Sequence, residues 1–218
     1  MEIRRVGASA YLVECVDGDE VEAVRAEAWR RRAAGLLRAV DVVPGERTLL
    51  LDGAVGDEVR ALVEATVPGV GVLDGAGLVT IATVPEVGVP DGAGLVTIAT
   101  VFDGEDLGAV GEWWGVPAGE VVTRLTGVVL RVAFCGFAPG FAYLRGLPAE
   151  WAVPRLAAPR PRVPAGSLAL AGEYAGIYPS ASPGGWQLVG RTTETLFDVR
   201  REPPALLTPG TRVRLVAL

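Results

Sequence analysis

The chain has 218 residues, half of them hydrophobic, which is enough for one large or two small domains that each bury a core. A net charge of -6, with no basic run longer than residues 30–32, excludes a surface of the kind that binds nucleic acid. No segment has the length of an apolar membrane span and the first residues lack a secretory signal, so we expect a cytoplasmic protein that does not contact a membrane.

Two residue types that supply much of enzyme chemistry are missing: all twenty basic residues are Arg, and the chain contains neither His nor Lys. Without His there is no ordinary catalytic triad and no imidazole metal ligand, and without Lys there is no Schiff base. Cys15 and Cys135 each lie in an apolar run, which favours buried free thiols over a disulfide or a nucleophile. We therefore predict no metal site and assign no catalytic residue.

The first part of the chain alternates extended and helical patterns. Residues 10–16 are apolar and extended in character, and residues 19–38 have helical spacing. Residues 40–43 and 48–51 predict a hairpin around a proline-glycine turn, and residues 56–66 return to a helical pattern. This order resembles a split β-α-β arrangement, so we predict an α+β, ferredoxin-like domain over residues 1–86.

A tandem duplication of 17 residues occupies positions 70–103, where VGVLDGAGLVTIATVPE is followed by VGVPDGAGLVTIATVFD. Each copy joins a glycine turn to a β-branched run and should supply one strand. The glycine turns precede a strand and not a helix, so they are poor phosphate loops. A duplicated linker and strand without catalytic meaning is favoured over a functional repeat.

Beyond the duplication, two short helices are predicted at residues 106–114 and 117–125, with Pro117 in the first turn of the second helix. Short β-branched or aromatic runs separated by Gly and Pro then predict a closed or nearly closed β-barrel over residues 87–218, with the domain boundary placed within about ten residues. The predicted strands are residues 128–134, 167–171, 185–190, 195–199 and 212–216.

Three segments dense in glycine and proline carry the candidate site: FCGFAPGFAYL at 134–144, PRPRVPAGS at 159–167 and YPSASPGGWQLVGRT at 178–192. Arg162 and Arg191 each offer a planar fork that matches a carboxylate, while Ser167, Gln187 and Thr192 offer hydrogen bonds to an amide or carboxyl group. Aromatic walls and glycines that admit a close approach of backbone N–H groups complete a predicted pocket for a small anionic amide. These residues are Phe137, Phe141, Tyr178, Trp186, Gly140, Gly166, Gly184, Gly185 and Gly190.

Each of these residues also has a purely structural interpretation. The glycines suit turns with positive φ, and the aromatic residues suit the barrel core. The two arginines would equally pair with a carboxylate such as Asp198 or Glu173. Ser182 has neither His nor Lys to activate it, which disfavours a nucleophilic role.

The chain resembles one known family in four sequence motifs, GFAPGFAYL, PRPRVPAGS, GIYP and SPGGWQLVGRT. This is the family of the bacterial 5-oxoprolinase B subunit, also called allophanate hydrolase subunit 1. One branch of the family is the kinase A inhibitor of sporulating bacteria. The resemblance covers nearly the whole chain, and its specific motifs lie in the barrel half. It implies a ferredoxin-like domain followed by a cyclophilin-like barrel that resembles the carboxyltransferase module of urea carboxylase.

The resemblance also implies partners and a cofactor arrangement. The barrel would pair with a relative of the C subunit (allophanate hydrolase subunit 2), and a relative of the A subunit would bind ATP, so that this chain itself binds no cofactor. In relatives a histidine commonly ends the helix before the strand that leads to GFxPGFxYL, and Leu125 holds the matching position here. If that histidine contacts substrate, this chain has lost the contact.

Three functions follow from these observations. The leading one is a non-autonomous subunit of an ATP-dependent 5-oxoprolinase or related allophanate or amide hydrolase. The alternative is a regulator that inhibits a sensor histidine kinase, which an exposed apolar patch on the barrel would favour. Carboxyl transfer between biotin and urea is weaker, because such modules usually accompany a biotinylated lysine.

Overall fold

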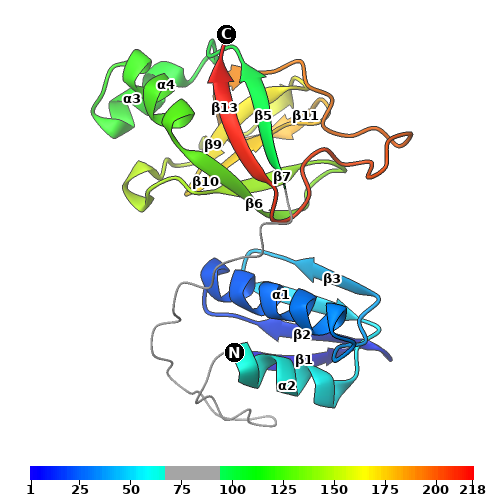
Figure 1. The fold of residues 1–218 in the computed structure, drawn as a ribbon. Helices are drawn as coiled ribbons and strands as arrows, with labels where there is room; N and C mark the ends of the chain where they lie inside the picture. The colour runs from blue at the N-terminus through cyan, green and yellow to red at the C-terminus, as the bar shows by residue number, and fades with distance from the viewer. Residues whose placement is uncertain (67–93) are drawn as a thin grey trace. The chain divides into compact units, whose positions relative to one another are not determined.

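The computed structural model describes residues 1–66 and 94–218 and divides the chain into two compact units, Met1–Gly92 and Ala93–Leu218 (Figure 1). The boundary predicted near residue 87 and the first copy of the duplication lie outside the described residues, so both stay predictions.

The first unit is a four-stranded antiparallel sheet in the order β1-β2-β4-β3, with two helices on one face (Figure 1). Strand β4 lies between β2 and β3, which α1 connects, and this is the split β-α-β arrangement of a ferredoxin-like fold. Strand β1 pairs with the outer side of β2. The elements are β1 (Glu2–Val6), β2 (Ala10–Glu14), α1 (Gly18–Ala33), β3 (Asp41–Pro44), β4 (Thr48–Asp52) and α2 (Gly56–Thr66).

Helix α1 has a clear start and a clear stop. The Asp17 carboxylate accepts the backbone N–H groups of Asp19 and Glu20 at 3.1 and 2.9 Å, which satisfies two donors of the first turn. Gly35 has a φ of 71°, the left-handed conformation in which a helix commonly ends. The helix therefore ends at Ala33, before the predicted end at residue 38.

The second unit is a seven-stranded sheet in the order β12-β9-β10-β7-β6-β13-β5, in which β5 pairs in parallel with β13 and the other pairs are antiparallel. The two edges meet where Val101 and Arg191 exchange backbone hydrogen bonds of 2.8 Å each, so the sheet nearly closes into a barrel. The strands are β5 (Leu95–Thr100), β6 (Val129–Cys135), β7 (Ala142–Arg145), β9 (Ser167–Ala171), β10 (Tyr174–Ile177), β12 (Gln187–Arg191) and β13 (Arg212–Ala217).

Smaller elements complete the barrel unit. Helices α3 (Leu107–Trp114) and α4 (Ala118–Gly127) pack on each other and on β12 and β13 respectively. A short 3-10 helix (Ala149–Trp151) precedes a two-stranded pair formed by β8 (Arg160–Val163) and β11 (Ser182–Gly184). Pro117 is the residue before α4 and not part of its first turn, one position from the prediction.

Each unit has a hydrophobic core of its own. In the first unit, Leu49 and Leu51 of β4 are buried against the helices. In the second unit, the main cluster lies inside the barrel and includes Leu125 of α4, which is fully buried. A second cluster there contains Phe141, Val163, Ala169, Ala171, Tyr174, Tyr178, Trp186 and Leu188.

The predicted α+β class, with a ferredoxin-like unit followed by a cyclophilin-like barrel, is confirmed. The second copy of the duplication supplies β5, as expected. The strand predicted at residues 195–199 is wrong, because its pairing is limited to an isolated antiparallel bridge between Phe197 and Ala205. The Arg201 guanidinium donates to the carbonyl oxygens of Thr195 and Leu196 at 3.1 Å each.

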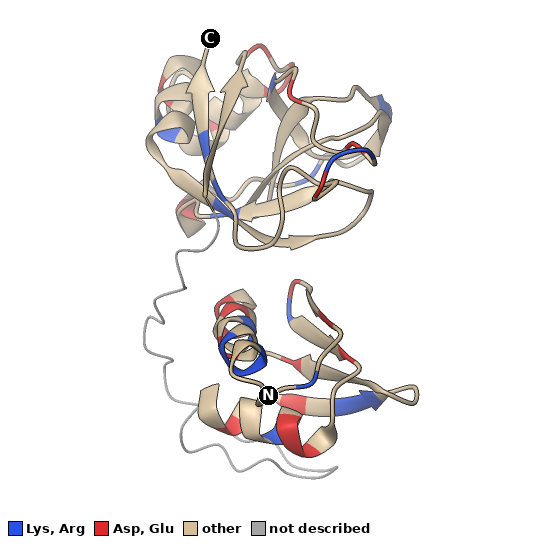
Figure 2. Ribbon diagram, turned by 45° about the vertical axis from the view of Figure 1, so that its right-hand side comes forward, with Lys and Arg blue, Asp and Glu red and all other residues tan. Residues whose placement is uncertain are grey.

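Charged residues of both signs are interspersed on the helices of the first unit (Figure 2). In α1, Arg25 pairs with Glu22 and Arg31 with Glu27, so these arginines face carboxylates of their own helix. Among residues 1–66 and 94–218, no helix is long and apolar enough to cross a membrane. The same residues contain no group of three or more acidic or Cys side chains arranged to hold a metal ion.

Candidate functional site

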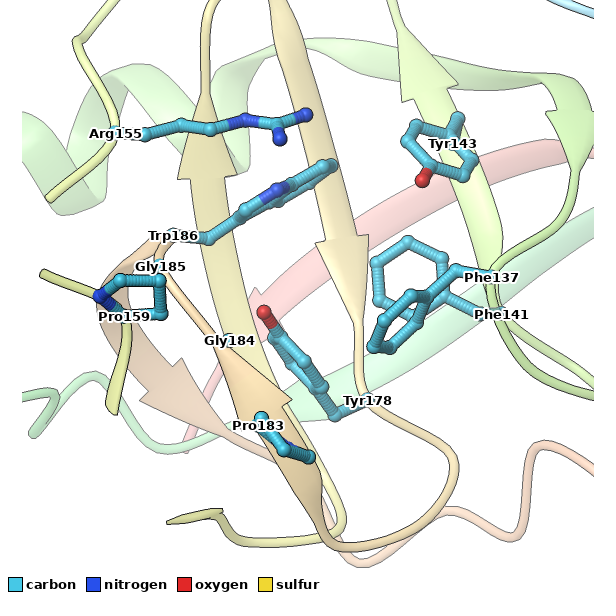
Figure 3. A pocket seen from close by; sticks show the side chains of 10 residues that line it. All are labelled: Phe137, Phe141, Tyr143, Arg155, Pro159, Tyr178, Pro183, Gly184, Gly185 and Trp186. Carbon is cyan, nitrogen blue, oxygen red and sulfur yellow. The ribbon is translucent and has the colours of Figure 1, made fainter. Parts of the chain in front are cut away.

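The barrel unit has a pocket of about 250 Å³ (Figure 3). Its walls come from the loop between β6 and β7, the end of β10, the loop before β8, and the residues around β11. Most lining side chains are aromatic or lack polar atoms. They are Phe137, Phe141, Tyr143, Arg155, Pro159, Tyr178, Pro183, Gly184, Gly185 and Trp186.

Phe141 is the centre of the aromatic wall. Its ring makes edge-to-face contacts with Phe137, Tyr143, Tyr178 and Trp186, at centroid distances between 5.1 and 5.5 Å. Phe141, Tyr178 and Trp186 are almost completely buried. The pocket wall is therefore also part of the second hydrophobic cluster of the barrel unit, so these residues have both a structural role and a place in the pocket.

Phe137 occupies an unusual backbone conformation at the edge of the pocket. Its φ of 66° makes it the one described residue other than glycine with positive φ, and 61% of the residue is exposed. The turn around it is closed by hydrogen bonds from Ala138 N–H to Gly136 O at 2.7 Å and from Gly136 N–H to Phe141 O at 3.2 Å. This turn presents an aromatic side chain to solvent beside the pocket.

Glycines leave the space that the rings fill. A Cβ at Gly176 of β10 would lie 2.9 Å from the Phe141 ring and 3.0 Å from the Trp186 ring. A Cβ at Gly184 would lie 2.2 Å from the Tyr178 hydroxyl. Neither position has positive φ, so these glycines are required for space and not for backbone conformation.

Tyr178 brings a hydroxyl group to the aromatic wall. Burial is the main cause that raises the pKa of Tyr178, and Tyr143 adds to it, while Arg155 and Arg160 act in the opposite direction. The phenol is therefore protonated at neutral pH and can donate a hydrogen bond to a ligand.

Six predicted site residues lie together in this pocket, namely Phe137, Phe141, Tyr178, Gly184, Gly185 and Trp186. Five polar predictions lie outside its lining, namely Arg162, Ser167, Gln187, Arg191 and Thr192. Of the remaining glycines, Gly140 and Gly166 have φ values of 82° and 81°, and they fit the turn interpretation.

The two arginines chosen from the sequence are placed differently from the expectation. Arg191 pairs with Asp103, with its Nε donating at 2.9 Å and its Nη2 lying 2.8 Å from Oδ2, and this partner holds the pKa of Arg191 above its ordinary value. Asp198 and Glu173, the carboxylates that the sequence suggested as partners of these two arginines, pair with Arg200 and Arg145 respectively. Arg162 is exposed on β8.

The other polar predictions are buried. The Gln187 amide donates to the carbonyl oxygen of Pro154 at 2.8 Å. The Thr192 hydroxyl accepts the backbone N–H of Glu194 at 3.2 Å, and Ser167 is buried at the start of β9.

Sequence reasoning missed Tyr143, Arg155, Pro159 and Pro183 as lining residues. Tyr143 belongs to the first motif segment and follows its aromatic pattern, so the signal was present. Arg155 stands between the motif segments as an isolated cation in a loop, and only the fold brings it to Trp186. Leu125, which holds the place of the family histidine, is buried in α4 and does not line the pocket.

Both cysteines are free thiols, as the sequence favoured. Burial raises the pKa of Cys15 to about 12 and that of Cys135 to about 11. Since the thiolate is the reactive form, neither residue has the environment of a nucleophile.

The barrel, its aromatic pocket and the preceding ferredoxin-like unit define the class of this protein. The chain matches the family described as the carboxyltransferase domain, subdomain C and D, over residues 1–207, and it belongs to that family.

Two bacterial relatives are similar to about half of the chain. The chain is 48% identical over 113 residues to the 5-oxoprolinase B subunit of Escherichia coli O157:H7, a match that covers 52% of each chain. It is 42% identical over 115 residues to the 5-oxoprolinase B subunit of Bacillus subtilis (strain 168), covering 53% of this chain and 48% of that protein. The chain thus spans about half the length of the curated relatives it matches.

The solved structure of TTHA0988 supports the architecture over almost the whole chain. It superposes with a TM-score of 0.72 at 29% identity, covering 97% of this chain and 40% of that one.

Proposed function

We propose that this chain is the B-type subunit of an ATP-dependent 5-oxoprolinase or related allophanate or amide hydrolase complex. Its barrel pocket holds a small anionic amide beside a C-type subunit. ATP binds to an A-type subunit, and this chain binds no cofactor. The complex works in the cytoplasm.

The observation that carries the proposal is the composition of the pocket. Aromatic faces and glycines form most of its walls, which suits a small planar amide, and the protonated Tyr178 hydroxyl offers a donor to the amide oxygen. None of the lining residues in the described chain is a carboxylate, a His or a Lys, so no general base of the usual kind faces the ligand. A pocket that can bind but cannot carry out hydrolysis is what one subunit of a larger complex would contribute.

The proposal is tested by reconstitution. The chain is co-expressed with its C-type partner, the A-type partner is added, and ATP-dependent formation of glutamate from 5-oxoproline is measured. Activity should require all three subunits, and Phe141→Ala should abolish it, because the ring holds four neighbouring aromatic residues in place. Full activity in the absence of this chain would overturn the proposal.

The same preparations address the regulatory alternative. Each is added to a purified sensor histidine kinase and autophosphorylation is followed. A chain that inhibits the kinase and is dispensable for glutamate formation belongs to the inhibitor branch.

A further inference from the structure

Arg155 is the one ionised side chain among the residues that line the pocket in the described chain. Its guanidinium lies over the Trp186 ring, 5.9 Å from the centroid. Figure 3 shows the side chain extended along Trp186, on the side of the pocket away from Pro183. Arg155 is an exposed residue, so its cation stands at the edge of a wall whose other residues are aromatic, proline or glycine.

Arg155 differs from nearby arginines in what it contacts. Arg160 binds Asp106 through its Nη2 at 2.8 Å and also pairs with Glu105, while Arg191 pairs with Asp103. Within residues 1–66 and 94–218, no carboxylate forms an ion pair with Arg155. Its planar set of N–H donors is available to an anion that enters the pocket.

The backbone on both sides of Arg155 is anchored to the segment that carries Trp186. The carbonyl oxygen of Pro154 accepts the buried Gln187 amide at 2.8 Å, and the N–H of Leu156 donates to Gly185 O at 2.8 Å. Gln187 and Gly185 flank Trp186, so the backbone at Arg155 is held beside the segment that carries the ring. Anchoring of this kind lowers the ordering cost when a ligand binds.

We propose that Arg155 recognises the carboxylate of the ligand and that Gln187 is a positioning residue that holds Arg155 on Trp186. The ligand class is a small planar amide that carries a carboxylate: the amide packs among Phe141, Tyr178 and Trp186 while the carboxylate meets the guanidinium. This inference rests on the proposed function and deepens it, since it assigns the anion selectivity of the pocket to a residue that the sequence motifs do not include.

The first experiment compares Arg155→Gln with Arg214→Gln, an exposed arginine of β13 outside the pocket lining, in the reconstituted complex. Loss of a charge-assisted contact should raise KM for 5-oxoproline about 10- to 100-fold in Arg155→Gln, with a smaller change in kcat. The Arg214→Gln variant should match the unaltered complex. An unchanged KM in Arg155→Gln overturns the inference.

An uncharged analogue separates recognition from a structural role. 2-Pyrrolidinone has the same ring without the carboxylate, and its inhibition constant should be the same in Arg155→Gln as in the unaltered complex. Equal weakening of 5-oxoproline and 2-pyrrolidinone would show that the substitution damages the pocket, and the inference would fall.

Gln187 is tested by a double-mutant cycle. Gln187→Leu should raise KM for 5-oxoproline in the unaltered background and have little further effect in the Arg155→Gln background, because it acts through Arg155. Additive effects of the two substitutions would overturn the positioning role.

Direct titration keeps this inference separate from the proposed function. If the reconstituted complex forms no glutamate, the full chain is titrated calorimetrically with 5-oxoproline and with 2-pyrrolidinone. Tighter binding of the carboxylate-bearing ring that is lost in Arg155→Gln supports the inference although the oxoprolinase function fails. Binding of neither compound overturns both.

Discussion

Gly184 and Gly185 are neighbours in the pocket wall with different surroundings. A Cβ at Gly184 would lie 2.2 Å from the Tyr178 hydroxyl, whereas a Cβ at Gly185 would lie 3.6 Å from Pro159, an ordinary contact. Gly184→Ala should therefore displace the Tyr178 ring and cost about 1–3 kcal/mol of stability, with loss of ligand binding. Gly185→Ala is the matched control and should stay within about 0.5 kcal/mol.

Urea unfolding and calorimetric titration of the two glycine variants check this prediction. Equal effects of the two substitutions would contradict the steric explanation of the pocket wall.

The two thiols, Cys15 buried and Cys135 half-buried, predict a dependence of stability on pH. In the folded protein the pKa values of Cys15 and Cys135 are about 12 and 11, above the ordinary value of 9.0. Above pH 9 the unfolded chain loses these protons while the folded chain keeps them, so the free energy of unfolding falls as pH rises from 9 toward 11. Urea unfolding should show a smaller fall in a Cys15→Ala, Cys135→Ala variant than in the unaltered chain.

Thiol alkylation at pH 8 tests the same residues independently. A pKa of about 11 in place of 9.0 reduces the thiolate fraction about 100-fold, so iodoacetamide should modify the native chain far more slowly than the unfolded one. Alkylation at the rate of the unfolded chain would show that the thiols are not buried.

At the scale of single residues, the sequence identified the apolar pocket wall better than its polar groups. The aromatic and glycine residues of the wall lie within the motif segments themselves, so the sequence of those segments indicates the site. The partner of a polar side chain comes from elsewhere: Asp103 reaches Arg191, and Pro154 reaches Gln187. Such pairings depend on how the barrel closes and on the path of the loops, and no local sequence pattern predicts either.

At the scale of elements, strands with a continuous or alternating apolar pattern were predicted well, and strands that were short or had an interrupted pattern were missed. Residues 167–171 and 212–216 match β9 and β13 to within one residue. Strand β1 was missed because two arginines interrupt its alternation, and β10 because its sequence is only Tyr-Ala-Gly-Ile. In both cases pairing with a neighbouring strand outweighs weak local preference.

Closure of the barrel at Val101 and Arg191 predicts a strict requirement for glycine at position 190. A Cβ there would lie 2.6 Å from Val101 O and 3.2 Å from Phe102 Cα, both backbone atoms. Gly190→Ala should destabilise the protein by about 1–3 kcal/mol, because the seam of the barrel, where Val101 and Arg191 exchange backbone hydrogen bonds, must open. Chemical denaturation measures the change.

Gly119 in α4 provides the control for the seam, since a Cβ there would meet no atom within 4 Å. Gly119→Ala should leave stability unchanged or raise it by up to about 1 kcal/mol. A Gly190→Ala variant as stable as Gly119→Ala would show that the seam is not tightly closed.

At the scale of the whole molecule, the separate cores predict independent folding of the barrel unit. The two clusters of that unit contain only residues between 98 and 215, and the cluster of the first unit contains only residues between 13 and 63. A fragment of residues 94–218 should therefore unfold cooperatively and retain its aromatic near-ultraviolet circular dichroism.

A shorter fragment of residues 102–218 tests the contribution of β5. It lacks the fully buried Ile98 and leaves the edge of β13 unpaired, so it should lose the cooperative transition or aggregate. Cooperative unfolding of this fragment would contradict the assignment of β5 to the barrel.

The parallel pairing of β5 with β13 poses a problem of competition within one chain. The seven residues LVTIATV at 95–101 have the same sequence as residues 78–84. Because the two segments are identical, the backbone pairing with β13 does not by itself favour one over the other. Discrimination must come from the residues that follow. At Gly104 a Cβ would lie 2.3 Å from Leu188 O, and the equivalent residue of the first copy is Val87. Val87 carries a Cβ and two methyl groups where Gly104 has no side chain, so the limited space at Leu188 favours the second copy, and Gly104→Val would remove this advantage.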